Sequence, residues 1–403
     1  MEVMAGYKET ELGAVPEDWE CERISDAAAN SANAIVGGPF GSDLVSADYA
    51  AMGVPVIRGQ NMAAGVVSGD FVFVSPQKAK SLSANLAHPG DLIFTQRGTL
   101  GQVAIVPNDR HECYLVSQSQ MKVSLNRTRH DPCFVHQYFA SRAGQKQIAL
   151  SAIQTGVPHT NLGILRAYRF PAPPLPEQRA IAVALSDVDA LLGGLDRLIA
   201  KKRALKQAAM QQLLTGQTRL PGFQGEWEVK RLGDMLTICH GRNQREVEDA
   251  SGLYPILATG GQIGTASRAL YDKPSVLIGR KGTINQPRYM ETPFWTVDTL
   301  FYSATKGEHN AKFLYYRFCL IDWMQYNEAS GVPSLNARTI ESVEVAAPVP
   351  AEQSAIASVL TDMDAELAAL EARRDKTRAL KQAMMQELLT GRTRLVPVGG
   401  AHA

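Results

Sequence analysis

The sequence is poor in cysteine and has no long apolar run. Its five cysteines are odd in number, scattered along 403 residues, and form no C-x-x-C pair. This argues against a disulfide framework and a zinc ribbon, and is typical of a chain in a reducing cytoplasm. No run reaches about 18 apolar residues, and the N-terminal segment lacks the basic and apolar regions of a secretory signal. We therefore expect a cytoplasmic protein without membrane contact.

The sequence also lacks an excess of charge of either sign. The formal net charge is +1, with 45% apolar and 20% charged residues, as in an ordinary globular protein. Nucleic-acid binders are often basic, so this balance counts mildly against one, although it leaves room for a local basic surface. A chain of 403 residues exceeds one ordinary core, which predicts two or three domains.

Catalytic and metal-binding motifs are missing as well. There is no G-x-x-x-x-G-K-[ST], and the glycine-rich stretch 258–267 fails the G-x-G-x-x-G spacing, so we interpret it as a turn. The prolines of PAPPLPEQ do not form the [DNS]-P-P-[YF] loop of amino-methyltransferases, and no E-x-K follows the acidic pair of PNDRHEC as a metal-dependent nuclease requires. The eight histidines form no H-x-x-x-H or H-E-x-x-H pair. We predict neither an active site nor a metal site.

What the chain does contain is an internal duplication. LKQAAMQQLLTG at 205–216 returns as LKQAMMQELLTG at 380–391, and direct comparison of 177–220 with 352–395 gives 27 identical positions out of 44. The G-V-P motif at 156–158 returns at 331–333 in the same register, whereas W-E at 19–20 returns at 227–228 with a larger offset. Self-similarity of this length indicates two copies of one plan, and the extra residues of the first copy lie between its W-E and G-V-P motifs.

Each copy ends in a predicted long helix. Pro176 suits the first turn, Glu177 favours its positive end, and Gly216 suits the position after its last turn. Apolar residues recur at alternating spacings of four and three, as in a coiled-coil seam, and resume after the basic stretch 201–203. The stripe comprises Ile181, Leu185, Val188, Leu192, Leu195, Ile199, Leu205 and Leu213, and in the second copy Ile356, Leu360, Met363, Leu367, Leu370, Leu380, Met384 and Leu388.

A stripe this narrow requires a partner. Two matching helices of about 38 residues, roughly 57 Å each, favour antiparallel pairing with one another, which would place the intervening blocks at opposite ends of a rod. The alternative is two separate helices, each packed on its own block.

The blocks before the helices are predicted to be rich in strands. Short β-branched or aromatic runs alternate with Gly, Pro, Asn and Asp, for example in VPVIRGQ, GDFVFVS, YPILATGG and PSVLIGRKG. Helical stretches at 134–150 and 311–326 are expected to close the two blocks. The segments 91–102 and 275–286 align around a shared Gly-Thr, and each is followed by a predicted strand, LVSQSQMKV or WTVDTLFYS. The blocks therefore share a distant plan but have diverged far more than the helices.

These motifs resemble those of the specificity (S) subunits of type I restriction–modification systems. The resemblance is carried by YKETELGAVPEDWE, by PPLPEQRAIA with LLTGQTRL, and by EQSAIASVL with LLTGRTRL, and it covers essentially the whole chain. It implies an α+β fold with two strand-rich target-recognition domains, 1–172 and 217–347, joined by long antiparallel helices, 173–216 and 348–391, that form a coiled-coil spacer with pseudo-twofold symmetry. Residues 392–403 follow as a tail, and its final segment VPVGGAHA is expected to be disordered.

The resemblance also implies function and partners. Each recognition domain would read one half of a bipartite, gapped site in double-stranded DNA, and the helices would dock two methyltransferase subunits. The chain itself would not be an enzyme and would hold no cofactor. S-adenosylmethionine, ATP and Mg would be used by the methyltransferase and restriction/translocase subunits.

Side chains that can reach base edges or phosphates stand beside glycines in both blocks. The candidates for DNA contact are Arg58, Gln60, Asn61, Gln96, Arg97, Thr99 and Gln118 in the first block, Arg242, Asn243, Arg280, Lys281, Thr283 and Asp298 in the second, and His159, Asn161, Ser334 and Asn336 around the shared G-V-P motif. The last four are expected to contact phosphate or to frame the fold rather than to read sequence. For each candidate, the plainer interpretation is a surface turn residue.

Two rival interpretations remain at the level of sequence. A fragment of a fused restriction–methylation enzyme would require the catalytic motifs that the sequence lacks. A duplicated adaptor that binds proteins rather than DNA is favoured by the near-neutral charge, and it predicts weak DNA binding that is insensitive to salt.

Overall fold

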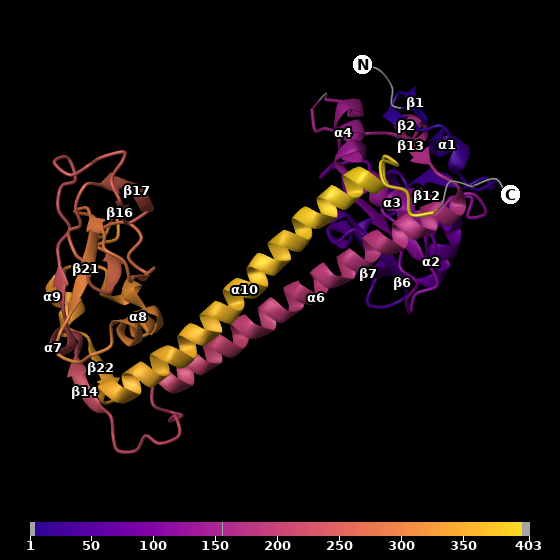
Figure 1. The fold of residues 1–403 in the computed structure, drawn as a ribbon. Coiled ribbons are helices and arrows are strands. Elements are labelled where there is room, and N and C mark those ends of the chain that lie inside the picture. The colour runs from indigo at the N-terminus through magenta and orange to yellow at the C-terminus, as the bar shows by residue number, and fades with distance from the viewer. Residues whose placement is uncertain (1–4, 155, 397–403) are drawn as a thin grey trace. The chain divides into compact units, whose positions relative to one another are not determined.

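The computed structural model describes residues 5–154 and 156–396, which divide into two compact units. The first comprises Met1–Gly194 and Arg374–Ala403, and the second comprises Leu195–Arg373. Each unit therefore contains one block, the start of one long helix and the end of the other (Figure 1). Within the predicted tail, 397–403 lie outside the described residues.

Two sheets and short helices build the first block. One sheet has the order β10-β9-β12-β4 and the other β5-β7-β6-β11-β8, while β1 pairs with β2 and β3 with β13. Polar N-caps begin the short helices, such as Ser75 before α2 and Asp131 before α3. The elements are β1 (Tyr7–Thr10), β2 (Gly13–Pro16), β3 (Glu20–Arg23), α1 (Ile24–Ala27), β4 (Ile35–Gly37), β5 (Tyr49–Ala50), β6 (Val54–Ile57), η3 (Gly59–Met62), β7 (Val72–Val74), α2 (Pro76–Ser81), β8 (Leu86–Ala87), β9 (Leu92–Thr95), β10 (Val103–Ile105), β11 (Tyr114–Val116), β12 (Gln120–Val123), α3 (Pro132–Ala140), α4 (Arg142–Ser151), α5 (Leu162–Ala167) and β13 (Arg169–Ala172).

The second block repeats this plan in reduced form. Its sheets have the orders β15-β21-β18-β19 and β17-β16-β20, and β14 pairs with β22. Its elements are β14 (Glu228–Arg231), α7 (Leu232–Met235), β15 (Leu236–Cys239), β16 (Tyr254–Ala258), β17 (Gly261–Ala266), β18 (Ser275–Gly279), β19 (Arg288–Met290), β20 (Trp295–Thr296), β21 (Leu300–Thr305), α8 (Ala311–Leu320), η5 (Trp323–Tyr326), α9 (Ala337–Ser342) and β22 (Glu344–Ala347).

The four-stranded sheets correspond strand for strand, and the three-stranded sheet of the second block corresponds to the core of the five-stranded sheet of the first. β10-β9-β12-β4 corresponds to β19-β18-β21-β15, and the core β7-β6-β11 of the larger sheet corresponds to β17-β16-β20, including the parallel pair β6/β11 or β16/β20. The first block adds β5, β8 and α2, which lie between the W-E and G-V-P motifs where the sequence placed its extra residues. The distant homology of the blocks is therefore visible in their topology.

Two predicted strands differ from the structure. LVSQSQMKV and WTVDTLFYS were each expected to form one strand, but each forms two strands, β11 and β12 or β20 and β21, separated by a tight turn. The two predicted helical stretches are confirmed, but each is divided. The stretch 134–150 forms α3 and α4, separated at Ser141, whose side chain caps α4, and the stretch 311–326 forms α8 and the 3-10 helix η5. The polar residues inside these apolar runs mark turns and caps rather than exposed positions on continuous elements.

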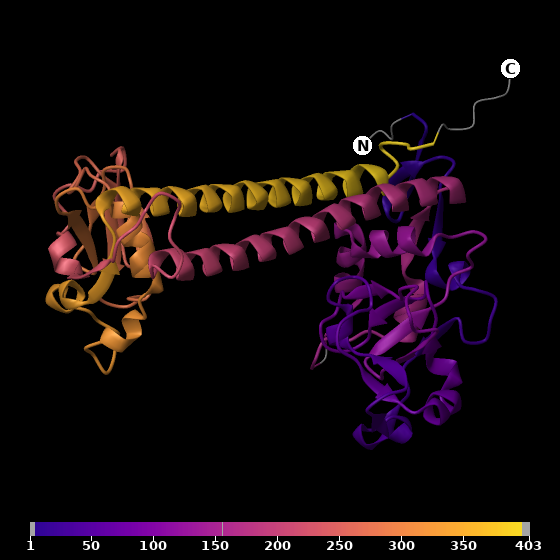
Figure 2. The same ribbon diagram turned by 90° about the horizontal axis from the view of Figure 1, so that it is seen from below.

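The predicted antiparallel helix pair is confirmed. α6 spans Leu175–Leu214 and α10 spans Pro350–Leu388, and both views draw them side by side (Figures 1 and 2). In the first unit, Lys381 of α10 lies 2.7 Å from Asp189 of α6. In the second unit, Lys206 of α6 pairs with Asp364 of α10. These two ion pairs join residues that correspond in the duplication, so they are pseudo-equivalent.

The basic stretch does not interrupt the seam as the sequence suggested. Continuing the alternation of three and four beyond Ile199 leads to Lys202 and Lys206, whose side chains are 30% and 20% exposed and face Glu366 and Asp364. Leu205, which was placed in the stripe, is instead 47% exposed. Charged residues in a seam cost stability but restrict the register in which two helices pair.

The repeated LLTG phrase closes the core of each unit. Leu213 and Leu214 at the end of α6 are buried among the apolar residues of the second block, while Leu388 and Leu389 at the end of α10 are buried among those of the first. Gly216 and the corresponding Gly391 follow the helix ends with φ of 74° and 70°, a left-handed conformation that favours glycine. The phrase occurs twice because each block needs the end of a helix to complete its core.

None of the helices within residues 5–154 and 156–396 combines the length and apolar character needed to span a bilayer.

Candidate nucleic-acid interface

Four polypeptide segments that are far apart in sequence meet at one edge of the first block. They are the loop after β4 at Gly38, the loop after β9 at 96–99, the turn between β11 and β12 at 117–119, and the G-V-P loop at 157–160. Backbone hydrogen bonds join them: Gln96 N donates to Ser119 O at 2.7 Å, and Thr160 N donates to Gln96 O at 3.0 Å. We call these segments the first loop cluster.

The second block builds the same arrangement from corresponding residues. Its loop cluster consists of Gly241 after β15, 280–283 after β18, the 297–299 turn between β20 and β21, and 333–335 of the second G-V-P motif. Arg280 N donates to Thr299 O at 2.9 Å, and Leu335 N donates to Arg280 O at 3.0 Å. The hydrogen bonds match those of the first cluster within a few tenths of an ångström.

Glycines permit this close packing of backbone. A Cβ at Gly38 would lie 1.9 Å from Ser117 O, and one at Gly241 would lie 2.1 Å from Val297 O. Any other residue would therefore force the two segments apart. The glycine next to each Thr, Gly98 or Gly282, has φ of 102° or 89°. The repeated geometry thus fixes the backbone of both clusters and leaves the side chains free to differ.

The first cluster brings together most of its predicted residues. Arg97 forms an antiparallel bridge with His159, and Gln118 is exposed at the tip of the neighbouring turn. Gln96 is only 8% exposed, and its Oε1 is buried without a hydrogen-bond partner among the described residues. Arg58 lies beside the same turn, because Ser117 N donates to Ile57 O at 3.1 Å. Thr99 is exposed on the loop after β9.

In the second cluster, an ion pair joins two predicted residues. Arg280 Nη1 lies 2.5 Å from Asp298 Oδ1, and the two side chains are 31% and 71% exposed. Lys281 is exposed and bridges Ser334 through its backbone. The nearby Arg242 N donates to Thr296 O at 2.8 Å. Thr283 is exposed at the end of the loop after β18.

Other predicted residues have structural roles. Asn61 is 1% exposed, and its amide bonds the backbone of Arg58, Ser68 and Asp70. Asn161 and Asn336 are the N-caps of α5 and α9, which agrees with a framing role for the G-V-P region. Two further side chains are used locally: Gln60 donates to Asp70 O, and Asn243 accepts from Arg245 N.

Sequence reasoning missed the contribution of the β16–β17 turn. Thr259 Oγ1 donates to Thr299 O at 2.7 Å, and Arg288 Nη2 donates to Thr259 O at 3.1 Å. The glycines at 260 and 261 marked a turn, but no signal in the sequence indicated that this turn would reach the second cluster.

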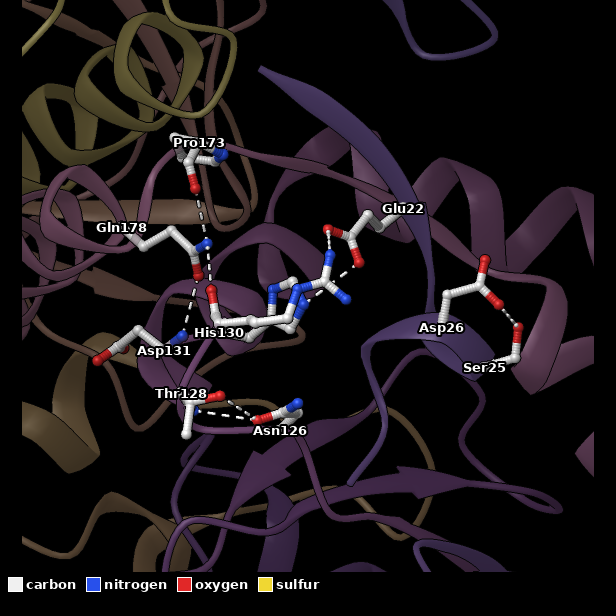
Figure 3. A network of polar contacts seen from close by, with 10 residues as sticks. Glu22, Ser25, Asp26, Asn126, Thr128, His130, Asp131, Pro173 and Gln178 are labelled. Atoms are coloured by element: carbon white, nitrogen blue, oxygen red, sulfur yellow. Dashed lines mark hydrogen bonds and ion pairs between the residues drawn. The ribbon is translucent and has the colours of Figure 1, made fainter. Parts of the chain in front are cut away.

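A glutamine at the start of each long helix hydrogen-bonds the backbone of the block that precedes the helix in sequence. Gln178 Nε2 donates to Pro173 O at 2.8 Å and Arg129 O at 3.1 Å, and its Oε1 accepts from Asp131 N at 2.9 Å (Figure 3). Gln353 repeats this in the second unit by accepting from Asn310 N and donating to Pro348 O. Asp131 and Asn310 are the N-caps of α3 and α8. Each glutamine therefore connects the start of a long helix to the start of α3 or α8.

In each unit, the glutamate that precedes this glutamine binds an arginine that lies a few residues after the end of the other long helix. In the first unit, Arg394 reaches the buried Glu177 at 2.7 Å and also pairs with Asp18. The hydrogen bond from Arg394 lowers the pKa of Asp18. In the second unit, Arg219 binds Glu352 in the same two-pronged manner, with both distances 2.6 Å. From the sequence, Glu177 was expected only to favour the positive end of the helix, and Arg394 was expected to lie in the tail. The ion pair between them was not predicted.

A titratable pair, the buried His130 and the half-buried Glu22, lies beside the glutamine of the first unit. Glu22 Oε2 is 3.3 Å from His130 Nε2, and Glu22 also pairs with Arg129 at 2.7 Å (Figure 3). Burial, assisted by the charge of Arg129, lowers the pKa of His130 to about 4. Burial also raises the pKa of Glu22. The imidazole is therefore neutral at physiological pH.

Across the described ranges, no group of three or more His, Cys, Asp or Glu side chains is arranged to hold a metal ion. What the two clusters offer is rigid backbone, exposed basic and amide side chains, and adjacent glycines. These groups can hydrogen-bond base edges and phosphates.

Comparison with known proteins identifies the family. The model of the type I restriction modification DNA specificity domain matches the chain twice, at residues 16–200 and 224–378. Each match spans one block and most of the helix that follows it.

Two relatives are similar to the chain, one along nearly its whole length and one along less than half of it. A chain described as the MjaX type I restriction enzyme specificity subunit of Methanocaldococcus jannaschii is 22% identical, and the match covers 96% of this chain and 97% of that relative. The EcoDI specificity subunit of Escherichia coli is 22% identical over 41% of this chain and 37% of its own.

Solved structures share the fold. The type I restriction–modification S subunit of M. genitalium superposes with a TM-score of 0.66 at 16% identity, covering 96% of this chain and 98% of that one. A chain from a structure of type I restriction–modification complex assembly gives a TM-score of 0.55 at 18% identity, covering 94% and 99%.

Proposed function

Because this chain belongs to the type I restriction–modification DNA specificity family, we propose that it reads one bipartite DNA site, with each unit recognising one half across an unread gap. Subunits of this family are the non-catalytic components of complexes that bind DNA and contain modification and restriction subunits. The chain therefore selects the sequence on which its partners act.

The loop cluster, built twice with different side chains, carries this proposal. Matching backbone hydrogen bonds give both clusters one scaffold, while Gln96 and Gln118 in the first correspond to Arg280 and Asp298 in the second. Different donors and acceptors on one scaffold suit the reading of two different short sequences. An adaptor that binds one protein twice would be expected to repeat the side chains as well.

The two long helices support docking of two copies of one partner. Leu205 and the corresponding Leu380 are 47% and 55% exposed, and neither belongs to the buried core of its unit. Their exposed neighbours are identical in the two copies: Lys201 and Lys376, Ala204 and Ala379, Gln207 and Gln382, Ala208 and Ala383. Internal packing does not account for an identical exposed surface on both helices, whereas two identical methyltransferase subunits would require it.

The chemistry would be divided among the subunits. We assign S-adenosylmethionine to the methyltransferase subunits, and ATP and Mg to the restriction/translocase subunits. This chain would contribute DNA recognition and the docking surfaces.

Substitution of the exposed leucines tests the docking. L205E and L380E should each remove one methyltransferase subunit from the purified complex, and the double variant should remove both, because each places a charge in an apolar contact. Native mass spectrometry of the complex gives the stoichiometry. L253E, at an 86% exposed leucine of the second block, is the matched control and should retain both subunits. Unchanged stoichiometry in the double variant would contradict docking at this surface.

Salt dependence separates the DNA-reading proposal from the adaptor. Specific DNA binding by the assembled complex should weaken steeply with salt, with a slope of log K on log salt of about −0.9 per phosphate contacted. Fluorescence anisotropy of a labelled duplex between about 50 and 200 mM salt measures this slope. A slope near zero would favour the adaptor.

A further inference from the structure

The Arg280–Asp298 pair differs from the other basic groups of the second loop cluster. Arg280 lies immediately after β18, and its backbone is held on both sides, by Thr299 O at 2.9 Å and by Leu335 N at 3.0 Å. The preceding Gly279 is packed so closely that a Cβ would lie 2.3 Å from Thr283 O. The base of this side chain is therefore fixed by the fold.

The guanidinium group is oriented as well. Nη1 donates to Asp298 Oδ1 at 2.5 Å and to Asp298 O at 3.4 Å. The Nη1 end of the guanidinium group is therefore held by the turn between β20 and β21. The side chain is 31% exposed, and Nε and Nη2 have no hydrogen-bond or ion-pair partner among the residues that the structure describes. An arginine with one free edge and a fixed orientation presents two parallel donors, which match the O6 and N7 acceptors of guanine.

The neighbouring cations lack this combination. Lys281 is exposed and carries a compact charge on a flexible chain, which suits phosphate. Arg288 is directed at Thr259 O and supports the turn between β16 and β17. In the first cluster, the position of Arg280 is taken by Gln96, and that of Asp298 by Gln118, so no corresponding ion pair exists there.

We propose that Arg280, oriented by Asp298, reads one guanine in the half-site recognised by the second unit. Arg280 is then a specificity-determining residue and Asp298 a positioning residue. This inference rests on the proposed function, and it adds a base identity at one position of one half-site. It also predicts that the first half-site lacks an equivalent guanine contact, because glutamine occupies that position.

The test maps methylated sites by single-molecule sequencing in cells that express the complete system with wild-type chain, R280A, R280Q or D298N. R280A should lower the preference for guanine at one position about 10- to 100-fold while leaving the other half-site unchanged, as loss of one bidentate base contact requires. R280Q should shift the preference at that position towards adenine, because glutamine pairs with N6 and N7 of adenine. D298N should relax the same position more weakly.

Two further variants act as controls. R231Q removes the arginine of another ion pair of this unit, Arg231–Glu344 at 3.6 Å, which lies outside the cluster, and it should preserve the motif. K281A should lower methylation at all sites without altering the motif. Melting temperatures of the purified complexes identify any variant that is misfolded, and in that case D298N provides the test.

The outcomes separate this inference from the function on which it rests. A gapped motif for the wild type that persists unchanged in folded R280A and D298N would overturn the role of Arg280 and leave the proposed function intact. Failure of the wild type to direct methylation to any gapped motif would overturn the proposed function itself.

Discussion

At the scale of single residues, the Glu-Gln pair at the start of each long helix explains why this dipeptide is repeated. Glu177 and Glu352 are 1% exposed and bind an arginine that follows the end of the other helix. Gln178 and Gln353 tie the helix start to the N-cap of α3 or α8. The sequence predicted that these positions belong to a helix start, but it could not reveal their partners. Glu177 and Arg394 are 217 residues apart.

Removal of Arg394 should destabilise the first unit. R394A leaves Glu177 buried with Trp19 Nε1, at 3.1 Å, as its one remaining side-chain donor among the described residues, and we expect a loss of about 3 kcal/mol in unfolding free energy. Urea unfolding followed by tryptophan fluorescence measures the change. R392A removes a 57% exposed arginine that lies 3.8 Å from Glu387, and it should cost less than about 1 kcal/mol. Equal effects of the two variants would contradict the structural role of Arg394.

His130 should make the first unit sensitive to mild acid. Its folded pKa of about 4 lies below the ordinary value of 6.5, so the folded state resists protonation. Stability is therefore present above pH 6.5 and is lost as the pH falls from 6.5 towards 4. Glu22 acts in the opposite sense, because burial raises its pKa and protonation therefore favours the folded state, which partly offsets the loss.

The comparison of wild type with H130F measures this effect. Phenylalanine keeps the edge-on contact with Phe170 but cannot be protonated. The wild type should lose on the order of 1–2 kcal/mol between pH 6.5 and 5, whereas the variant should lose less. Parallel pH profiles in urea unfolding would show that His130 is not the responsible group.

At the scale of elements, the helices were the most predictable part of the chain and the loop turns the least. A regular apolar alternation over six positions identifies a coiled-coil seam regardless of what surrounds it. The sequence could not place Lys202 and Lys206 in that seam. A lysine is stable at a seam position here only because Glu366 and Asp364 on the facing helix pair with it. The turns at 117–119 and 297–299 were missed for a similar reason, since backbone contacts with distant loops stabilise them.

Lengthening both helices should widen the gap between the half-sites. Seven residues inserted after Ile199 in α6 and after Glu371 in α10 preserve the heptad seam and add about 10.5 Å, or about three base pairs of DNA. Methylation mapping of the lengthened variant should give the original half-sites with a wider gap. Unchanged spacing with altered half-sites would mean that the helices do not set the gap.

At the scale of the whole molecule, the duplication accounts for the organisation of both units. Each block is completed by the start of one helix and the end of the other, so LLTG, the Glu-Gln pair and the arginine that follows LLTG all occur twice. The sequence predicted the family, the fold class and the two copies, because the repeated motifs lie on helices whose pattern is local. The bases that we propose these loops to contact were not predictable, because the proposed contacts depend on side chains that the fold brings together from four loops.

A methylation map of the host genome by single-molecule sequencing, with and without this gene, shows whether this chain directs methylation to a bipartite DNA site. We expect methyladenine at one motif made of two short half-sites separated by unread base pairs. Deletion of the gene should abolish this signal, and reintroduction should restore it. A methylation signal that depends on the gene but occurs at a continuous motif, or a map that stays the same when the gene is removed and restored, would contradict this expectation.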